Sequence, residues 1–156
     1  MSYSRGLVGL LLIATIVAGS GCGADPEQLV RDRIEEARLA AEAGDLKALG
    51  AMLAEEFVDD RGNDRAAVLA LVGYYIRVDG GLHIWTRIDG IKIAESGEAQ
   101  VRLLVALAAG PIEKLEDLTR LRAEVHRFTL TLVEAGGGDW QLTHATWARA
   151  SLADVL

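Results

Sequence analysis

The 156-residue chain contains one cysteine, Cys22, and two prolines. A single thiol cannot form an intramolecular disulfide or a zinc site built from several thiolates, so we expect neither in this fold. Basic residues are also scarce: 16 lysines and arginines face 23 aspartates and glutamates, which gives a formal net charge of −7. Nucleic-acid binding depends on basic side chains that neutralise phosphates, so this balance excludes nucleic acid as an expected partner.

Motifs for nucleotides, cofactors and metals are absent from the sequence as well. It contains no Gly-x-Ser-x-Gly nucleophile motif, no phosphate-binding loop and no dinucleotide-binding fingerprint. Gly136–Gly138 precedes an expected strand and not a helix, so it is typical of a hairpin turn. His83, His126 and His144 lack the spacing of a metal site. We therefore expect no metal and no cofactor.

One apolar run stands out, and it lies near the start of the sequence. Leu7–Ala18 is apolar apart from a glycine and a threonine. The run follows the positive charge of Arg5 and precedes small residues at positions 19–21. A spanning helix needs ~20 apolar residues, so this shorter run is instead typical of a secretory signal, which we predict over residues 1–21.

The position of the only cysteine resembles the lipobox of bacterial lipoproteins, in which a cysteine directly after the signal is lipidated. Cys22 occupies this position, although Gly19 stands where a lipobox usually has an aliphatic residue. The resemblance implies a chain anchored in the bacterial envelope through lipidated Cys22, facing the periplasm, with residues 22–25 as a short tether. Gly23 is not the aspartate that retains many lipoproteins in the inner membrane, which favours the outer membrane.

Helical periodicity and capping residues predict three helices before residue 79. Asp25 caps the first and Asp45 caps a second, shorter one. Residues 55–62 are expected to be irregular or weakly extended. Asp64 caps a third helix over residues 65–77, in which we expect at least one of the two adjacent tyrosines to be part of the core.

After residue 81 the period changes to the two-residue alternation of β-strands. The first strand is interrupted at Asp89-Gly90, where we predict a bulge, because residues 91–94 are too few for a hairpin with the first half. A loop through residues 113–117 and a frayed tail over 151–156 are expected. The predicted strands are 82–94, 99–107, 121–134 and 140–150. Helices followed by consecutive antiparallel strands predict an α+β domain over residues 26–150.

This order of elements resembles the nuclear transport factor 2-like superfamily, the cone-shaped, cystatin-like fold shared with ketosteroid isomerases and polyketide cyclases. The residues that carry the resemblance are Gly44-Asp45, Leu53–Phe57, Asp64-Arg65, Gly138–Leu142 and Ala145–Trp147. It implies three helices packed on the concave face of a strongly bent, mostly antiparallel four-stranded sheet. It also implies a pocket at the mouth of the cone, but in this superfamily the fold does not define the function.

Asp59 and Asp60 are weak candidates for acid–base chemistry, because they lie between the second and third expected helices, near the mouth of the cone. Burial against Tyr74 or Tyr75 would raise the pKa of either carboxyl and make it a proton-shuttling base, with Tyr75 as a hydrogen-bond donor. The base, tyrosine and second acid of the isomerases do not map onto matching positions. The alternative is an acidic loop with a local ion pair, so we assign no catalytic residue.

A second group of candidates lies on the expected strands. Alternation places His83, Trp85 and Arg87 on one face, where they would form, beside His126 and His144, an amphipathic wall for an acidic or aromatic ligand. Trp147 is a further binding candidate. The alternative, which we favour, is an outer sheet face that is solvated, packed, or used for dimerisation.

We interpret the chain as a membrane-anchored lipoprotein that is not an enzyme and binds a small apolar ligand or an envelope protein. The basis is a fold that generates an apolar cavity without a catalytic constellation. One alternative is a small isomerase, hydratase or cyclase with an aspartate base. Another is a structural homodimer or a subunit of an envelope complex. The ligand hypothesis requires a cavity of roughly 300 Å³ or more, and a cone filled by Trp85, Phe128 and Trp147 would count against it.

Overall fold

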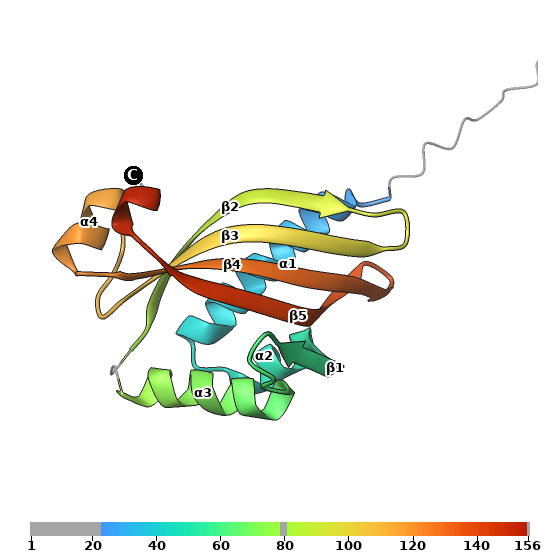
Figure 1. Cartoon of the computed structure of the whole chain (residues 1–156), viewed down its shortest axis with the longest axis horizontal. Coiled ribbons are helices and arrows are strands. Elements are labelled where there is room, and N and C mark those ends of the chain that lie inside the picture. The colour runs from blue at the N-terminus through green and yellow to red at the C-terminus, as the bar shows by residue number, and fades with distance from the viewer. Residues whose placement is uncertain (1–22, 79–80, 156) are drawn as a thin grey trace, which may run out of the picture.

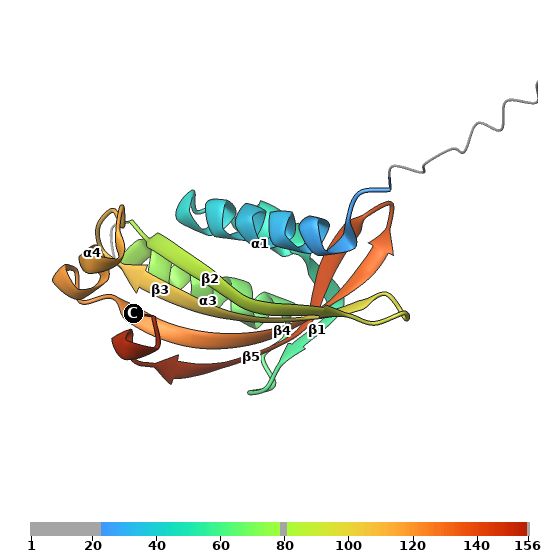
Figure 2. The ribbon, with the colours of Figure 1, turned by 90° about the horizontal axis from the view of Figure 1, so that it is seen from above.

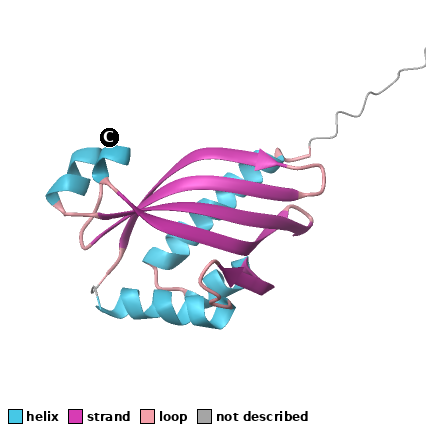
Figure 3. Ribbon diagram, in the orientation of Figure 1, coloured by secondary structure: helices cyan, strands magenta, loops and turns pink. Residues whose placement is uncertain are grey.

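Residues 23–78 and 81–155, which the computed structural model describes, form one α+β arrangement (Figures 1 and 3). This confirms the predicted fold class. The predicted signal and Cys22 lie outside the described residues. The helices are α1 (Pro26–Glu42), α2 (Leu46–Met52), α3 (Arg65–Val78) and α4 (Leu115–Arg120), and a short 3-10 turn covers Leu152–Asp154. The strands are β1 (Leu53–Asp59), β2 (His83–Ile93), β3 (Glu98–Ala108), β4 (Glu124–Gly136) and β5 (Asp139–Ala150).

The sheet of the described residues has five strands in the order β1-β5-β4-β3-β2, so the predicted number of four is wrong. The added strand is β1, which pairs in parallel with β5, whereas all other pairs are antiparallel. We expected residues 55–62 to be irregular or weakly extended, and we placed Leu53 in the second helix because it continues the helical spacing of Leu46 and Leu49. Leu53 instead adopts an extended conformation, and the chain enters the sheet directly from α2.

The predicted bulge at Asp89-Gly90 is confirmed. β2 runs as one strand along β3, and its register shifts between Ile88 and Gly90. A bulge inserts an extra residue into one strand and increases the local twist. The strands curl toward α1 as they cross the domain (Figure 2), so the sheet has a helix-covered inner face and an opposite outer face.

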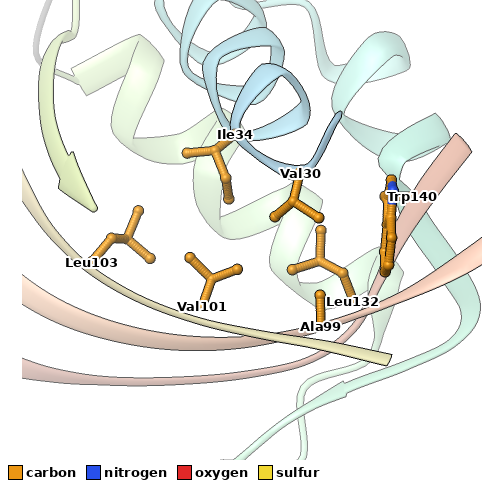
Figure 4. Close-up of a cluster of buried hydrophobic side chains, with 7 residues drawn as sticks. All are labelled: Val30, Ile34, Ala99, Val101, Leu103, Leu132 and Trp140. Carbon is orange, nitrogen blue, oxygen red and sulfur yellow. The ribbon is translucent and has the colours of Figure 1, made fainter. Parts of the chain in front are cut away.

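Helix α1 covers the inner face with a row of apolar side chains. Asp25 caps its first turn, since the Glu27 amide donates to the Asp25 carboxylate at 3.1 Å, as the sequence predicts. Val30 and Ile34 pack on β3, β4 and β5 (Figure 4). The other buried members of this cluster are Ala99, Val101, Leu103, Leu132 and Trp140.

Helix α3 joins the inner layer beside β1 and β5. The carboxylate of Asp64 accepts a hydrogen bond from the Ala67 amide at 2.9 Å, which confirms the predicted cap. Val68 and Leu69 of α3 pack around the buried Phe57 of β1 and Ala145 of β5. The tyrosines of α3 do not join this core. Tyr74 and Tyr75 are 56% and 48% exposed, so the expectation that one of them is buried is wrong.

The outer face is covered at one end by two elements that the sequence analysis missed. Helix α4 replaces the expected loop, because the Asp117 carboxylate accepts hydrogen bonds from the Glu113 and Lys114 amides at 3.1 Å. The 3-10 turn at Leu152–Asp154 replaces the expected frayed tail. Together they enclose a second core with apolar side chains of β2, β3 and β4; its buried members are Leu104, Ala106, Ala108, Leu118, Ala123, Val125 and Val155.

Candidate functional site

The predicted binding residues of the strands lie on opposite faces of the sheet. His83, Trp85 and Arg87 pair with Ala108, Ala106 and Leu104, which belong to the outer core. His126 pairs with Val105, and Trp147 pairs with Phe128, next to the cluster under α1. Because paired residues share a face, the five candidates do not form one wall.

The outer group is engaged in packing and in holding the end of the chain. Trp85 packs against the outer core. The guanidinium of Arg87 donates to the backbone carbonyls of Asp154 and Val155, both at 2.8 Å, and pairs with Asp89 at 3.0 Å. Trp85 and Arg87 therefore fix the 3-10 turn over the sheet. His144, also on this face, has its Nδ1 2.7 Å from the carbonyl of Val58 and supports the junction of β1 with β5.

Three aromatic side chains form a row on the inner face, and we call His126, Phe128 and Trp147 the aromatic strip. The rings of Phe128 and Trp147 stack with centroids 5.8 Å apart and an interplanar angle of 26°. His126 meets Phe128 edge-on at 6.5 Å. All three are half-buried. Stacked and edge-on pairs of this kind stabilise the position of each ring, so the strip is a preformed surface.

A cation lies over one end of this strip. The guanidinium carbon of Arg61 is 4.9 Å from the centre of the Trp147 ring, within the range of a cation–π interaction. Among the described residues, no carboxylate or carbonyl accepts a hydrogen bond from the guanidinium of Arg61. Its donors are therefore directed to solvent or to a ligand.

Buried Asp59 orders the loop that carries Arg61. Its carboxylate accepts hydrogen bonds from the amides of Arg61 and Asn63, both at 2.8 Å, and from the Asn63 side-chain amide at 2.7 Å. Burial alone would raise the pKa of Asp59, but the hydrogen bonds from Asn63 and Arg61 outweigh it and lower that pKa. Asp59 thus remains ionised and positions the loop, which contradicts the hypothesis of a base with a raised pKa.

The other candidates for acid–base chemistry are also unsuited to it. Asp60 is exposed, and Tyr75 lies on the solvent side of α3. Tyr75 contacts its neighbour Tyr74 edge-on at 5.9 Å. In the described part of the chain, no group of three or more histidine, cysteine or acidic side chains is arranged to hold a metal ion.

At the other end of the aromatic strip, charged side chains form a rim. His126 Nε2 is 3.8 Å from the carboxylate of Glu124, which also pairs with Arg149 at 3.3 Å. Arg149 pairs with His126 across β4 and β5, so it belongs to the inner face. The strip therefore has a guanidinium near each end, of which only that of Arg149 is paired with an acid in the structure.

A small apolar cavity lies next to the strip, beneath the three N-terminal helices. Its volume is about 130 Å³, and Arg33 is the one polar side chain among its lining residues. Val68, Leu69, Leu130 and Leu142 line this cavity and, like Trp147, pack against the cluster of Leu53, Phe57 and Ala145. The cavity falls short of the roughly 300 Å³ typical of a drug-sized ligand and matches a single benzene-sized group.

A larger hollow, of about 260 Å³, lies at the start of α1 and is lined by Leu29, Trp140, Glu134 and glycines of the β4–β5 hairpin. The Glu134 carboxylate there accepts a hydrogen bond from the Gly138 amide at 3.2 Å. This hollow shares no lining residue with the cavity beside Trp147. We therefore take the smaller cavity, whose lining shares Val68, Leu69, Leu130 and Leu142 with the cluster that Trp147 packs against, as part of the candidate site.

No protein-family model and no curated protein matches the sequence. Solved structures match the fold. An NTF-2 like protein of unknown function from Shewanella oneidensis has a TM-score of 0.59 at 17% identity, over 79% of this chain and 98% of that one. A protein from Novosphingobium aromaticivorans, provisionally named as a scytalone dehydratase, has a TM-score of 0.64 at 14% identity, over 80% and 84%. The fold is nuclear transport factor 2-like.

A third match shows that the nuclear transport factor 2-like fold also occurs in larger chains. Bd1075 from Bdellovibrio bacteriovorus has a TM-score of 0.60 at 14% identity, over 80% of this chain but only 40% of its own length. At these identities the likeness concerns the fold alone. No helix among the described residues is long and apolar enough to cross a membrane.

Two residues of the site, Phe128 and Arg61, are not among the binding residues predicted from the sequence. Phe128 could have been predicted from the sequence, because it lies two residues after His126 on the same strand and therefore shares its face. No sequence pattern predicts the contact of Arg61 with Trp147, because the two residues lie far apart in the sequence. The contact depends on the loop that Asp59 orders.

Proposed function

We propose that this chain is a non-catalytic binding module for a small aromatic anion, held at the bacterial envelope by lipidated Cys22. The observation that carries the proposal is Arg61 over the Trp147–Phe128 stack, with a guanidinium that has no acceptor among the described residues. An apolar surface with a few placed polar groups is the usual composition of a small-molecule site.

The chemistry of the ligand follows from the two parts of the site. A planar ring gains from entering the adjoining apolar cavity of about 130 Å³. A carboxylate on that ring can accept two parallel hydrogen bonds from Arg61, which favours anions over neutral analogues. The ligand is therefore a compact aromatic carboxylate, with room for about one ring.

Two features argue against catalysis at this site. The buried carboxylate nearest the strip, that of Asp59, is held ionised by hydrogen bonds and accepts them from the loop backbone. The residues that line the adjoining cavity include no acid, histidine or cysteine that could transfer a proton, and His126 lies beside Glu124 at the end of the strip away from Arg61. One matching structure carries the name of a dehydratase, but at 14% identity its likeness to this chain concerns the fold and not the activity.

The experiment is calorimetric titration of the protein with benzoate and with its neutral analogue benzamide. We expect benzoate to bind more tightly, and Arg61→Gln to weaken benzoate binding about tenfold, equivalent to ~1.4 kcal/mol, while benzamide binding changes little. Arg31→Gln is the matched control, because Arg31 is a partly exposed arginine on α1 that pairs with Glu27.

Equal loss of binding in the Arg61 and Arg31 variants would contradict the proposed site, and so would binding that Trp147→Ala leaves intact. The envelope anchor has a separate test. Cys22→Ser should move the protein from the membrane fraction to the soluble fraction of its host. A Cys22→Ser protein that still sediments with membranes would overturn the anchor and leave the ligand site untouched.

A further inference from the structure

Helix α3 exposes an apolar surface of its own. Six residues on its solvent side are uncharged and exposed; they are Ala66, Ala67, Ala70, Leu71, Tyr74 and Tyr75. The opposite side of the helix, with Val68 and Leu69, packs on the core. A surface helix normally carries charged residues on its outer side, and an apolar outer side marks an interaction surface.

The contrast with α1 shows that this composition is specific to α3. The exposed side of α1 carries Glu27, Asp32, Glu35 and Glu36, and arginines pair with three of these acids. α3 has arginines only near its two ends, Arg65 and Arg77, and no acid within its bounds. In a chain with a net charge of −7, the outer side of α3 is a place where two copies can approach without bringing acids together.

The exposed side chains of α3 form two parallel rows with a spacing of four residues. One row is Ala66, Ala70 and Tyr74, and the other is Ala67, Leu71 and Tyr75. In both rows the small residue comes first and the tyrosine last. Rows of this spacing are the ridges that interdigitate when two helices pack.

We propose that α3 is a self-association surface that pairs with α3 of a second copy in antiparallel orientation. A two-fold axis near Leu71 places Tyr74 and Tyr75 of one copy over the alanines of the other, so large side chains meet small ones on both sides. A parallel arrangement would set tyrosines against tyrosines and leave the alanines facing a gap. The pattern is therefore complementary to itself in the antiparallel orientation.

The charges at the ends of α3 favour the same orientation. Asp64 caps the first turn and Asp60 is exposed just before it, while the guanidinium of Arg65 is directed toward Gly50 of α2. Arg77 is exposed in the last turn. An antiparallel pair brings each Arg77 toward the acidic end of the partner helix, and the helix dipoles also oppose each other. This interface goes beyond the proposed ligand site and is independent of it.

The size of the surface predicts a weak dimer. Two half-exposed tyrosines and a leucine offer on the order of 300 Å² of apolar area, against ~800 Å² per partner in a standard interface. Dimerisation in the micromolar range or weaker is therefore expected in solution. Two chains anchored in one membrane would meet at a higher effective concentration.

The test is sedimentation equilibrium of the full chain over a wide range of protein concentrations. We expect a monomer–dimer equilibrium whose dissociation constant rises at least tenfold in Tyr74→Glu and in Ala70→Glu. Both positions are exposed, so these variants retain the fold. The matched control is Leu115→Glu on α4, which is 39% exposed, like Leu71, and should leave the dissociation constant unchanged.

Charge reversal tests the orientation. Arg77→Asp should weaken the dimer, and adding Asp60→Arg to the same chain should restore part of the loss. A protein that remains monomeric at all concentrations would overturn the proposal. So would a dimer that Tyr74→Glu and Ala70→Glu do not weaken, since it would use another surface. Neither result bears on benzoate binding, so the failure of one proposal is distinguishable from that of the other.

Discussion

The two faces of the sheet each carry a tryptophan next to an arginine, but the two pairs differ in what surrounds them. On the outer face, Arg87 beside Trp85 donates to the carbonyls of Asp154 and Val155. On the inner face, Arg61 over Trp147 has no acceptor among the described residues. An arginine whose donors are satisfied by backbone carbonyls serves the fold, whereas one whose donors have no acceptor among the described residues can serve a ligand.

The largest expected effect is a loss of unfolding free energy on replacing the tryptophan of the outer face. Trp85→Ala removes a large side chain from the outer core, and we expect the free energy of unfolding to fall by about 3 kcal/mol. Denaturant unfolding monitored by circular dichroism measures this loss. At temperatures where the variant is folded, its affinity for benzoate should equal that of the unchanged protein. A large loss of affinity would place Trp85 in the ligand site.

Asp59→Asn is expected to have the next largest effect on the free energy of unfolding, and the size of this effect should depend on pH. Replacing the ionised acceptor of the Arg61 and Asn63 amides should cost about 2 kcal/mol of unfolding free energy. The pKa of Asp59 is lowered in the fold, so its contribution is full above the pKa of an unfolded aspartate, ~3.9, and is lost as the pH falls through the folded pKa.

The stability difference between the Asp59→Asn variant and the unchanged protein should therefore be constant near neutral pH and shrink in acid. Unfolding curves at pH 7 and below pH ~4 check this. Asp60→Asn is the control, because Asp60 is the exposed neighbour in the same loop. A difference that grows as the pH falls would mean that Asp59 is protonated in the fold, contrary to its hydrogen bonds.

Arg87→Ala should cost less, about 1.5 kcal/mol, because it removes hydrogen bonds to two carbonyls at the margin of the outer core. The released 3-10 turn should exchange its amide hydrogens faster, which hydrogen-exchange measurements detect residue by residue. Unchanged exchange at residues 152–155 would show that apolar packing alone holds the turn.

The smallest effect on stability is expected for Arg61→Gln. Arg61 is exposed, so the unfolding free energy should change by less than ~0.5 kcal/mol, although the affinity for benzoate falls about tenfold. Denaturant unfolding and calorimetry on the same sample check both values. A stability loss as large as that of Arg87→Ala would assign Arg61 a structural role and remove the difference between the faces.

The sequence analysis predicted those features that depend on neighbouring residues. The caps at Asp25, Asp45 and Asp64 and the bulge at Asp89-Gly90 are local, and the structure contains all four. Alternation correctly grouped His83, Trp85 and Arg87 on one face. It could not tell which face that is, because the choice depends on where α1, α4 and the C-terminal turn pack.

The missed elements lack a local signal. β1 follows α2 without a turn, and its first residue continues a helical spacing. α4 has few apolar residues, and its start depends on the Asp117 carboxylate that accepts backbone amides. The contact of Arg61 with Trp147 joins residues far apart in the sequence, so no spacing rule predicts it. Tyr74 and Tyr75 have a core-like pattern because the helix is apolar on both sides.

The measurement that tests the difference between the faces most directly is a benzoate titration followed by nitrogen–proton NMR of the indole groups. Trp85→Phe, Trp140→Phe and Trp147→Phe variants assign the three signals. We predict that the Trp147 signal shifts with the concentration of benzoate, whereas the Trp85 signal stays in place. A shift of Trp85 without a shift of Trp147 would contradict the account, because it would place the ligand on the face that the C-terminal turn covers.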